Sequence, residues 1–193
     1  MDLHKIFSES LSFDAYQKAV EVMTGEKLNS GNPDEVSLFS HVSLNDTRIQ
    51  RLLKTLSFED FKEDILSVNP ISLLVISEGW CGDASQILPV LVKMQEMNPN
   101  IRLGFVFRDQ NPLLIEKYNY KGTASIPIVI GIRDKEEVFT WGPRPEPGLK
   151  LLQKYKEEES YTKEEFSIDL QKWYNKDKGQ TILQELLLAC KSK

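Results

Sequence analysis

The chain has 193 residues, of which 40% are hydrophobic and 27% charged, a balance typical of a folded protein and unlike that of a disordered one. Its formal net charge of −5 excludes the strongly basic surface that nonspecific nucleic-acid binding requires. No apolar run approaches the roughly 20 residues of a membrane-spanning helix, and acidic residues interrupt the first 17 positions. We therefore expect a cytoplasmic protein with neither nucleic acid nor membrane as a partner.

The first 69 residues have the periodicity of helices joined by turns. Ser12 suits the N-cap of a helix that we expect to stop at Gly25, and residues 29–34 (NSGNPD) read as a connector. Two more helices are predicted, one after Ser43 and one from Phe58 to about Val68. None of these helices carries residues that suggest chemistry, so we interpret them as a packing extension.

The pattern changes at Ile71, where short apolar runs begin to alternate with helical periods. Such an order is typical of an α/β protein whose first two strands pair in parallel. The predicted strands are Ile71–Ser77, Ile101–Phe107, Ile126–Ile132 and Glu137–Trp141, with helices after the first two strands and a hairpin between the last two.

The remainder of the chain is again helical. One helix follows residues 142–147 (GPRPEP), a second follows the capping box from Thr162 to Glu165, and a last one starts at about Gln180. We expect a single globular domain made of three parts. These are a helical N-terminal extension (1–69), an α/β core (70–157) and a helical C-terminal extension (158–193).

Candidate chemistry narrows to very few side chains. Two distant cysteines and two histidines form neither a disulfide framework nor a zinc cluster, so we predict no metal and no cofactor. Cys190 lies in a leucine-rich run, where a small buried hydrophobic residue is the expectation. Cys81 instead lies in Gly79–Ser85 (GWCGDAS), where a buried strand gives way to a helix. Backbone N–H groups at such a helix start favour the thiolate and lower the thiol pKa.

The strand, the Trp80-Cys81-Gly82 run at a helix start, Pro89 within that helix and Ile126-Pro127 at a later strand resemble the thioredoxin superfamily. The resemblance covers roughly residues 71–155 and is strongest to a bacterial thioredoxin-like branch with a helical N-terminal extension. It implies a thioredoxin-like α/β fold, with a central mixed β-sheet flanked by helices. It also implies that Cys81 is the attacking thiol and that Pro127 is a cis-proline facing it. Substrate contacts would come from Trp80, Gly82, Asp83, Ile126 and Pro127.

Three positions depart from the family pattern. Ala84 replaces the second cysteine, which would resolve a mixed disulfide within the motif. Val75 stands where the family has a buried acid. Asp83 places a carboxylate beside the thiol, which opposes the thiolate.

Two functions follow from this combination. The first is monothiol thiol–disulfide exchange through Cys81, on a protein or low-molecular-weight thiol or disulfide, with an external thiol resolving the intermediate. The chain would then be an oxidoreductase without a resolving cysteine. The alternative is a redox-inactive module that binds peptides or a protein through the Trp80/Cys81/Pro127 face. A glutathione-bridged iron–sulfur site is disfavoured because the Cys-Gly-Phe-Ser run of that group is missing. The oligomeric state stays open.

Overall fold

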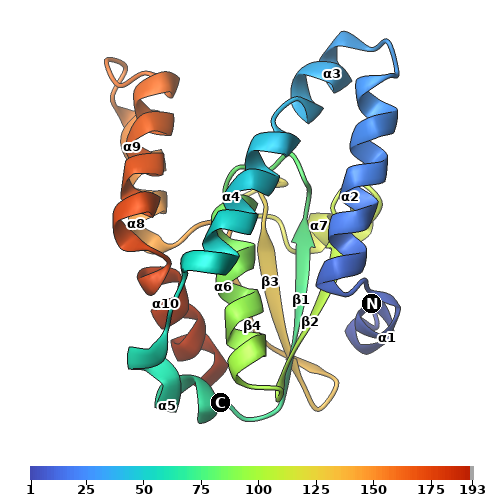
Figure 1. Cartoon of the computed structure of the whole chain (residues 1–193), viewed down its shortest axis with the longest axis vertical. Coiled ribbons are helices and arrows are strands. Elements are labelled where there is room, and N and C mark those ends of the chain that lie inside the picture. Colours follow the sequence, from blue (N-terminus) through green and yellow to red (C-terminus); the bar gives the residue numbers. More distant parts are fainter. Residues whose placement is uncertain (192–193) are drawn as a thin grey trace.

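Residues 1–191 of this computed structural model form a four-stranded sheet surrounded by helices (Figure 1). The strands are β1 (Ile71–Ser77), β2 (Ile101–Phe107), β3 (Ile128–Arg133) and β4 (Glu136–Trp141). The helices are α1 (Leu3–Glu9), α2 (Phe13–Leu28), α3 (Pro33–Phe39), α4 (Val42–Thr55), α5 (Lys62–Leu66), α6 (Ala84–Met97), α7 (Pro112–Lys117), α8 (Glu146–Glu157), α9 (Lys163–Asp177) and α10 (Gln180–Lys191), with a 3-10 turn at Glu59–Phe61. None of these helices is long and apolar enough to cross a membrane.

The sheet has the strand order β2-β1-β3-β4. β1 pairs in parallel with β2, from Ile71 opposite Ile101 to Ser77 opposite Phe107, and β3 is antiparallel to both β1 and β4. Every residue of β1 is buried. A strand in the middle of a sheet with both faces covered is expected to be apolar throughout, as this one nearly is. The α/β fold with a central mixed sheet is thereby confirmed.

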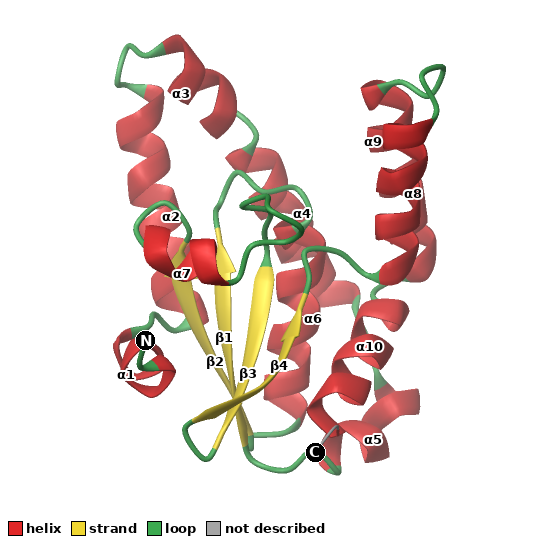
Figure 2. Ribbon diagram, turned by 180° about the vertical axis from the view of Figure 1, so that it is seen from behind, coloured by secondary structure: helices red, strands yellow, loops and turns green. Residues whose placement is uncertain are grey.

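Helices cover both faces of the sheet. Figure 1 shows α2 and α6 in front of it, and Figure 2, seen from behind, shows α7 in front of it and α1 beside β2. The ring of Tyr16 in α2 stacks on Phe105 and Phe107 of β2, with centroid distances of 5.3 and 5.0 Å. Helix α2 is therefore packed directly on the sheet.

Two helices of the N-terminal part differ from the prediction. α2 continues past Gly25 to Leu28, because Gly25 does not take the positive φ that ends a helix at a glycine C-cap. The predicted connector over residues 29–34 is shorter than expected, because the unpredicted helix α3 begins at Pro33. The Asn32 side chain caps the start of α3, and Pro33 occupies its first position. These two helices and α4 rise past the end of β1 that leads into α6 (Figure 1).

Candidate functional site

Cys81 lies in the turn between β1 and α6, at the end of the sheet where β1 finishes. Its backbone N–H donates to the Glu78 carbonyl at 3.1 Å, which fixes the turn. The thiol is 7% exposed and donates to the Ile126 carbonyl at 3.3 Å. The Ile126–Pro127 peptide bond is cis, and both residues are buried. The structure therefore brings together the cysteine and the proline motif that lie 45 residues apart in sequence.

Burial raises the pKa of the Cys81 thiol to about 12, and the nearby Asp83 carboxylate adds to this rise. The backbone N–H groups of Ala84 and Asp83 lower the pKa, as expected at a helix start, and Arg144 acts in the same direction. Desolvation outweighs these contributions because the sulfur lies among apolar groups. The predicted lowering of the thiol pKa is therefore wrong, whereas the predicted opposition by Asp83 is confirmed.

Asp83 belongs to a buried polar cluster next to the thiol. Its Oδ2 lies 2.5 Å from Nη2 of Arg144, and its Oδ1 accepts a hydrogen bond of 2.8 Å from the Tyr174 hydroxyl. Burial raises the pKa of the Asp83 carboxyl despite the opposing effect of Arg144. The Asp83 side chain is thus committed to contacts within the protein, and it connects the start of α6 with the segment after β4 and with α9.

Trp80 is half-buried, and the guanidinium of Arg108 lies 4.6 Å from the centre of its ring. The indole N–H is buried and has no hydrogen-bond partner within residues 1–191. Arg108 also donates from Nη1 to the Ala124 carbonyl at 3.4 Å, just before Ile126. Trp80 is therefore partly covered by a cation rather than freely exposed.

Glu78 follows β1 directly and is 2% exposed. Its Oε1 accepts a hydrogen bond of 2.9 Å from the Asp109 N–H, in the loop after β2. Burial raises the pKa of this carboxyl to about 7. A second carboxyl group therefore lies within the same turn as Cys81, and it titrates near neutral pH.

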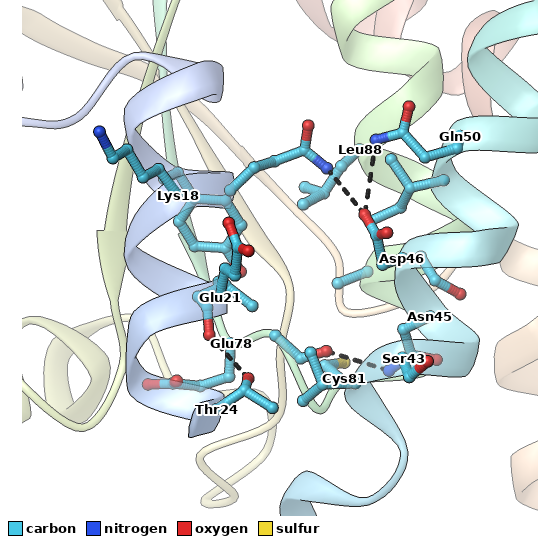
Figure 3. Close-up of a pocket in the computed structure, with 18 residues that line it drawn as sticks. Lys18, Glu21, Thr24, Ser43, Asn45, Asp46, Gln50, Glu78, Cys81 and Leu88 are labelled. Atoms are coloured by element: carbon cyan, nitrogen blue, oxygen red, sulfur yellow. Dashed lines mark hydrogen bonds between the residues drawn. The ribbon is translucent and has the colours of Figure 1, made fainter. Parts of the chain in front are cut away.

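A cavity of about 640 Å³ opens beside the thiol, between α2, α4 and the first turns of α6. Figure 3 shows Cys81 on its floor, with Glu21 and Thr24 on the α2 side and Asp46 and Gln50 on the α4 side. Small-molecule sites commonly enclose roughly 300–1,000 Å³, so the cavity is of ligand size. Its lining residues include Cys81 and do not include Ile126 or Pro127.

Two glycines of the β1–α6 turn have opposite surroundings. A Cβ on Gly79 would collide with Cγ1 of Val20 in α2, whereas a Cβ on Gly82 would meet nothing within 4 Å. Because Val20 is β-branched and stiff within a helix, it has little freedom to move aside. Gly79→Ala is expected to lower the free energy of unfolding by about 1–3 kcal/mol, measured by urea denaturation. Gly82→Ala is the matched control, and equal losses for both variants would contradict the close packing of α2 on this turn.

Cys190 is buried, as predicted, and its thiol is free. The backbone carbonyl of Cys190 accepts a hydrogen bond from the Arg133 side chain, and Arg133 is the last residue of β3. Cys81 contacts Ile126, which lies just before the first residue of β3. Seven residues of extended chain span roughly 20 Å. A disulfide needs Cα atoms within about 7 Å of each other. Cys190 therefore cannot resolve a disulfide formed at Cys81 in this fold.

The sequence interpretation missed Glu78, Arg144, Tyr174 and Arg108. Arg144 could have been noticed, because a lone arginine between two prolines stands out in residues 142–147. Tyr174 carried no comparable signal, since its partner Asp83 lies 91 residues earlier. Glu78 is one carboxylate among many in an acidic chain, and only the fold shows that it is buried.

Comparisons with known proteins agree with this geometry. The sequence pattern of a family described as Thioredoxin matches residues 32–156. A thioredoxin from Streptomyces clavuligerus is 27% identical over 103 residues, which cover 49% of this chain and 96% of that protein. A putative thioredoxin 2 from Streptomyces coelicolor is 32% identical over 95 residues, covering 49% and 68%, respectively. A thioredoxin from Chlamydia caviae is 30% identical over 87 residues, covering 45% and 80%.

Two solved structures share the fold over nearly the whole length. A protein of unknown function from Pseudomonas aeruginosa superposes with a TM-score of 0.66 at 17% identity, covering 98% of this chain and 96% of that one. An HIV epitope-scaffold superposes with a TM-score of 0.65 at 16% identity, covering 98% and 97%. The extensions are therefore part of a fold found elsewhere. With the family pattern matching well over half of its residues, the chain belongs to the thioredoxin family.

Proposed function

We propose that the protein carries out monothiol thiol–disulfide exchange through Cys81. The observation that carries this proposal is the position of the sulfur, which lies at the start of α6, faces the Ile126–Pro127 segment and lines a ligand-sized cavity. The Cys81 thiolate attacks a disulfide R–S–S–R, forming a mixed disulfide and releasing R–S⁻. An external thiolate then attacks the mixed disulfide, forms a new disulfide with R–S and returns the Cys81 thiolate.

An external thiol is required in this scheme because α6 offers no second cysteine. Ala84 is the first residue of the helix and is buried, and Cys190 lies at the other end of β3. Trp80, Gly82, Ile126 and Pro127 stay proposed substrate contacts. Asp83 is proposed to influence the pKa of the Cys81 thiol rather than to contact the substrate, because its carboxylate is already paired with Arg144.

Exchange through this thiol is expected to be slow at neutral pH. With a pKa of about 12, only about one thiol in 10⁵ is ionised at pH 7, compared with a few per cent for an ordinary cysteine. The greater intrinsic nucleophilicity of a high-pKa thiolate offsets part of this difference. The rate should therefore rise with pH well beyond the value at which an ordinary thiol reaches its plateau.

The Cys190→Ala variant allows this rate to be measured at Cys81 alone. We expect carbamidomethylation by iodoacetamide to accelerate about tenfold per pH unit from pH 7 to pH 10, without a plateau. A free small-molecule thiol in the same buffers serves as the control and levels off near pH 8.5–9. If the alkylation rate of the protein reached a plateau at or below pH 8.5, burial would not be what sets the pKa of the Cys81 thiol.

The second candidate is a redox-inactive thioredoxin-fold module that binds a partner through the Trp80/Cys81/Pro127 face. The burial of the Cys81 thiol and its raised pKa favour it. The two functions are separated by intact mass after incubation with a small disulfide at pH 9. An adduct on Cys81 that an added thiol removes supports exchange. The absence of any adduct at that pH leaves binding as the function.

A further inference from the structure

The cavity beside Cys81 has a wall that lies outside the part of the chain matched by the thioredoxin family. α2 ends at Leu28, whereas the family pattern starts at residue 32. The opposite wall is α4. Both walls are helices, whose backbone N–H and C=O groups are already hydrogen-bonded within the helix, so they offer no edge to which a peptide could add as a strand. Access to the sulfur from this side therefore suits a compact ligand rather than an extended peptide.

The charge of the cavity is strongly one-sided. Glu21, Asp46 and Glu78 contribute three carboxyl groups, and Lys18 is the single basic residue in the lining. Figure 3 shows the Lys18 side chain extending away from Asp46 and Cys81. Within residues 1–191, none of the three carboxyl groups has a lysine, arginine or histidine nitrogen within 4.0 Å.

The hydrogen-bond donors to Asp46 and Glu78 are neutral groups. Asp46 accepts long hydrogen bonds from the side-chain amides of Gln17 and Gln50, at 3.5 and 3.4 Å, and the first of these links α2 to α4 across the cavity. Glu78 is almost fully buried, and its Oε1 accepts a hydrogen bond from the backbone N–H of Asp109 in the loop after β2. Carboxylates without a paired cation repel an anionic ligand and attract an ammonium group. Glu21 and Asp46 are exposed, so the attraction exerted by each is modest and is screened by salt.

We propose that the cavity between α2 and α4 is a binding site for a small disulfide carrying an ammonium group. The ammonium lies between Glu21 and Asp46, and the disulfide lies against Cys81. This assignment rests on the proposed exchange reaction and names the class of its substrate. The Cys81 thiolate forms a bond to one ligand sulfur, the ligand S–S bond breaks, and the departing aminothiolate takes a proton from water. An external thiol then removes the bound half as a new disulfide.

Three probes of matched size test the charge preference. Cystamine, bis(2-hydroxyethyl) disulfide and 3,3′-dithiodipropionate share two-carbon arms on one disulfide and differ in their end groups, which are cationic, neutral and anionic. Binding is measured by calorimetry at pH 7.5 to the Cys81→Ser variant, in which no exchange can occur. We expect cystamine to bind at least about tenfold more tightly than the neutral probe, and the anionic probe to bind more weakly than either.

The source of the preference is tested with Glu21→Gln and Asp46→Asn in the same background. Each change is expected to weaken cystamine binding about fivefold, and the double variant should remove most of its advantage over the neutral probe. Glu26→Gln is the matched control, because Glu26 is exposed on α2 and does not line the cavity. Equal affinity for all three probes, no binding of any, or a preference that survives the double variant would overturn the assignment.

A separate measurement distinguishes failure of the site from failure of the proposed exchange. The Cys190→Ala protein is incubated with each probe at pH 9, and the adduct on Cys81 is followed by intact mass. Cystamine binding without any adduct would reject exchange and leave the cation site in place. Adducts formed at equal rates with all three probes would support exchange and reject the charge selection.

Discussion

Replacing Arg144 by methionine is expected to lower the free energy of unfolding by about 3–5 kcal/mol. The substitution keeps most of the side-chain volume and removes the cation that lies 2.5 Å from Asp83 Oδ2. The carboxylate is then left buried, with the Tyr174 hydroxyl as its one side-chain donor. A buried charge without its partner costs far more than the pair itself contributes. The shift of the urea midpoint at pH 8 measures this loss.

The matched control is Lys150→Met, which breaks an ion pair with Glu146 on the exposed face of α8. Exposed pairs contribute little, so its urea midpoint should stay at the wild-type value. The double variant Asp83→Asn with Arg144→Met should recover part of the stability, because it removes both charges. If Arg144→Met shifts the midpoint no further than Lys150→Met, the Asp83–Arg144 pair does not support the site.

Glu78 is expected to make the protein less stable as the pH rises from about 4.5 to about 7. Its pKa in the folded protein is about 7, because burial disfavours the charged form, whereas an unfolded glutamate titrates near 4.3. The folded state therefore holds a proton that the unfolded state has lost within this window. The stability that Glu78 contributes is fully present below the unfolded-state pKa of about 4.3, and it is lost as the pH rises through the folded-state pKa of about 7.

Glu78→Gln isolates this contribution, because the amide oxygen can still accept the hydrogen bond from Asp109. Relative to wild type, the variant should gain on the order of 2 kcal/mol of stability between pH 5 and pH 8, measured by urea denaturation at both pH values. Glu21→Gln is the control, since it alters an exposed carboxylate of the same cavity. A constant stability difference between Glu78→Gln and wild type at the two pH values would mean that Glu78 is ionised throughout.

The sequence predicted β1 and β2 well because these strands are mostly buried and clearly bounded. β1 and β2 begin and end at the predicted residues, each an apolar run between turn-forming residues. β3 starts at Ile128, two residues later than predicted, and β4 is largely exposed. The capping box at Thr162 likewise marks the start of α9. α3 was missed because its seven residues are too few to show a helical period, and turn-forming residues precede it.

The position of Cys81 at the start of α6 was predictable, and the environment of its sulfur was not. A helix start favours a thiolate, and the contributions of the Asp83 and Ala84 N–H groups are present. The net effect has the opposite sign because long-range packing buries the sulfur, with α2 and α4 forming the walls of the adjacent cavity. The local sequence predicts where the helix starts, whereas the desolvation of the Cys81 sulfur depends on helices that are distant in the chain.

The hydrogen bond from the Tyr174 hydroxyl to Asp83 forms late during synthesis of the chain. A ribosome makes the protein from its N-terminus, and domains begin to fold as they emerge. When residues 32–156, the stretch shared with the thioredoxin family, have left the ribosome, Arg144 is already in place and α9 is not. The carboxylate beside the thiol then lacks its hydroxyl donor until Tyr174 follows. The surroundings of Cys81 are thus completed only after the family-defining part of the chain has been synthesised.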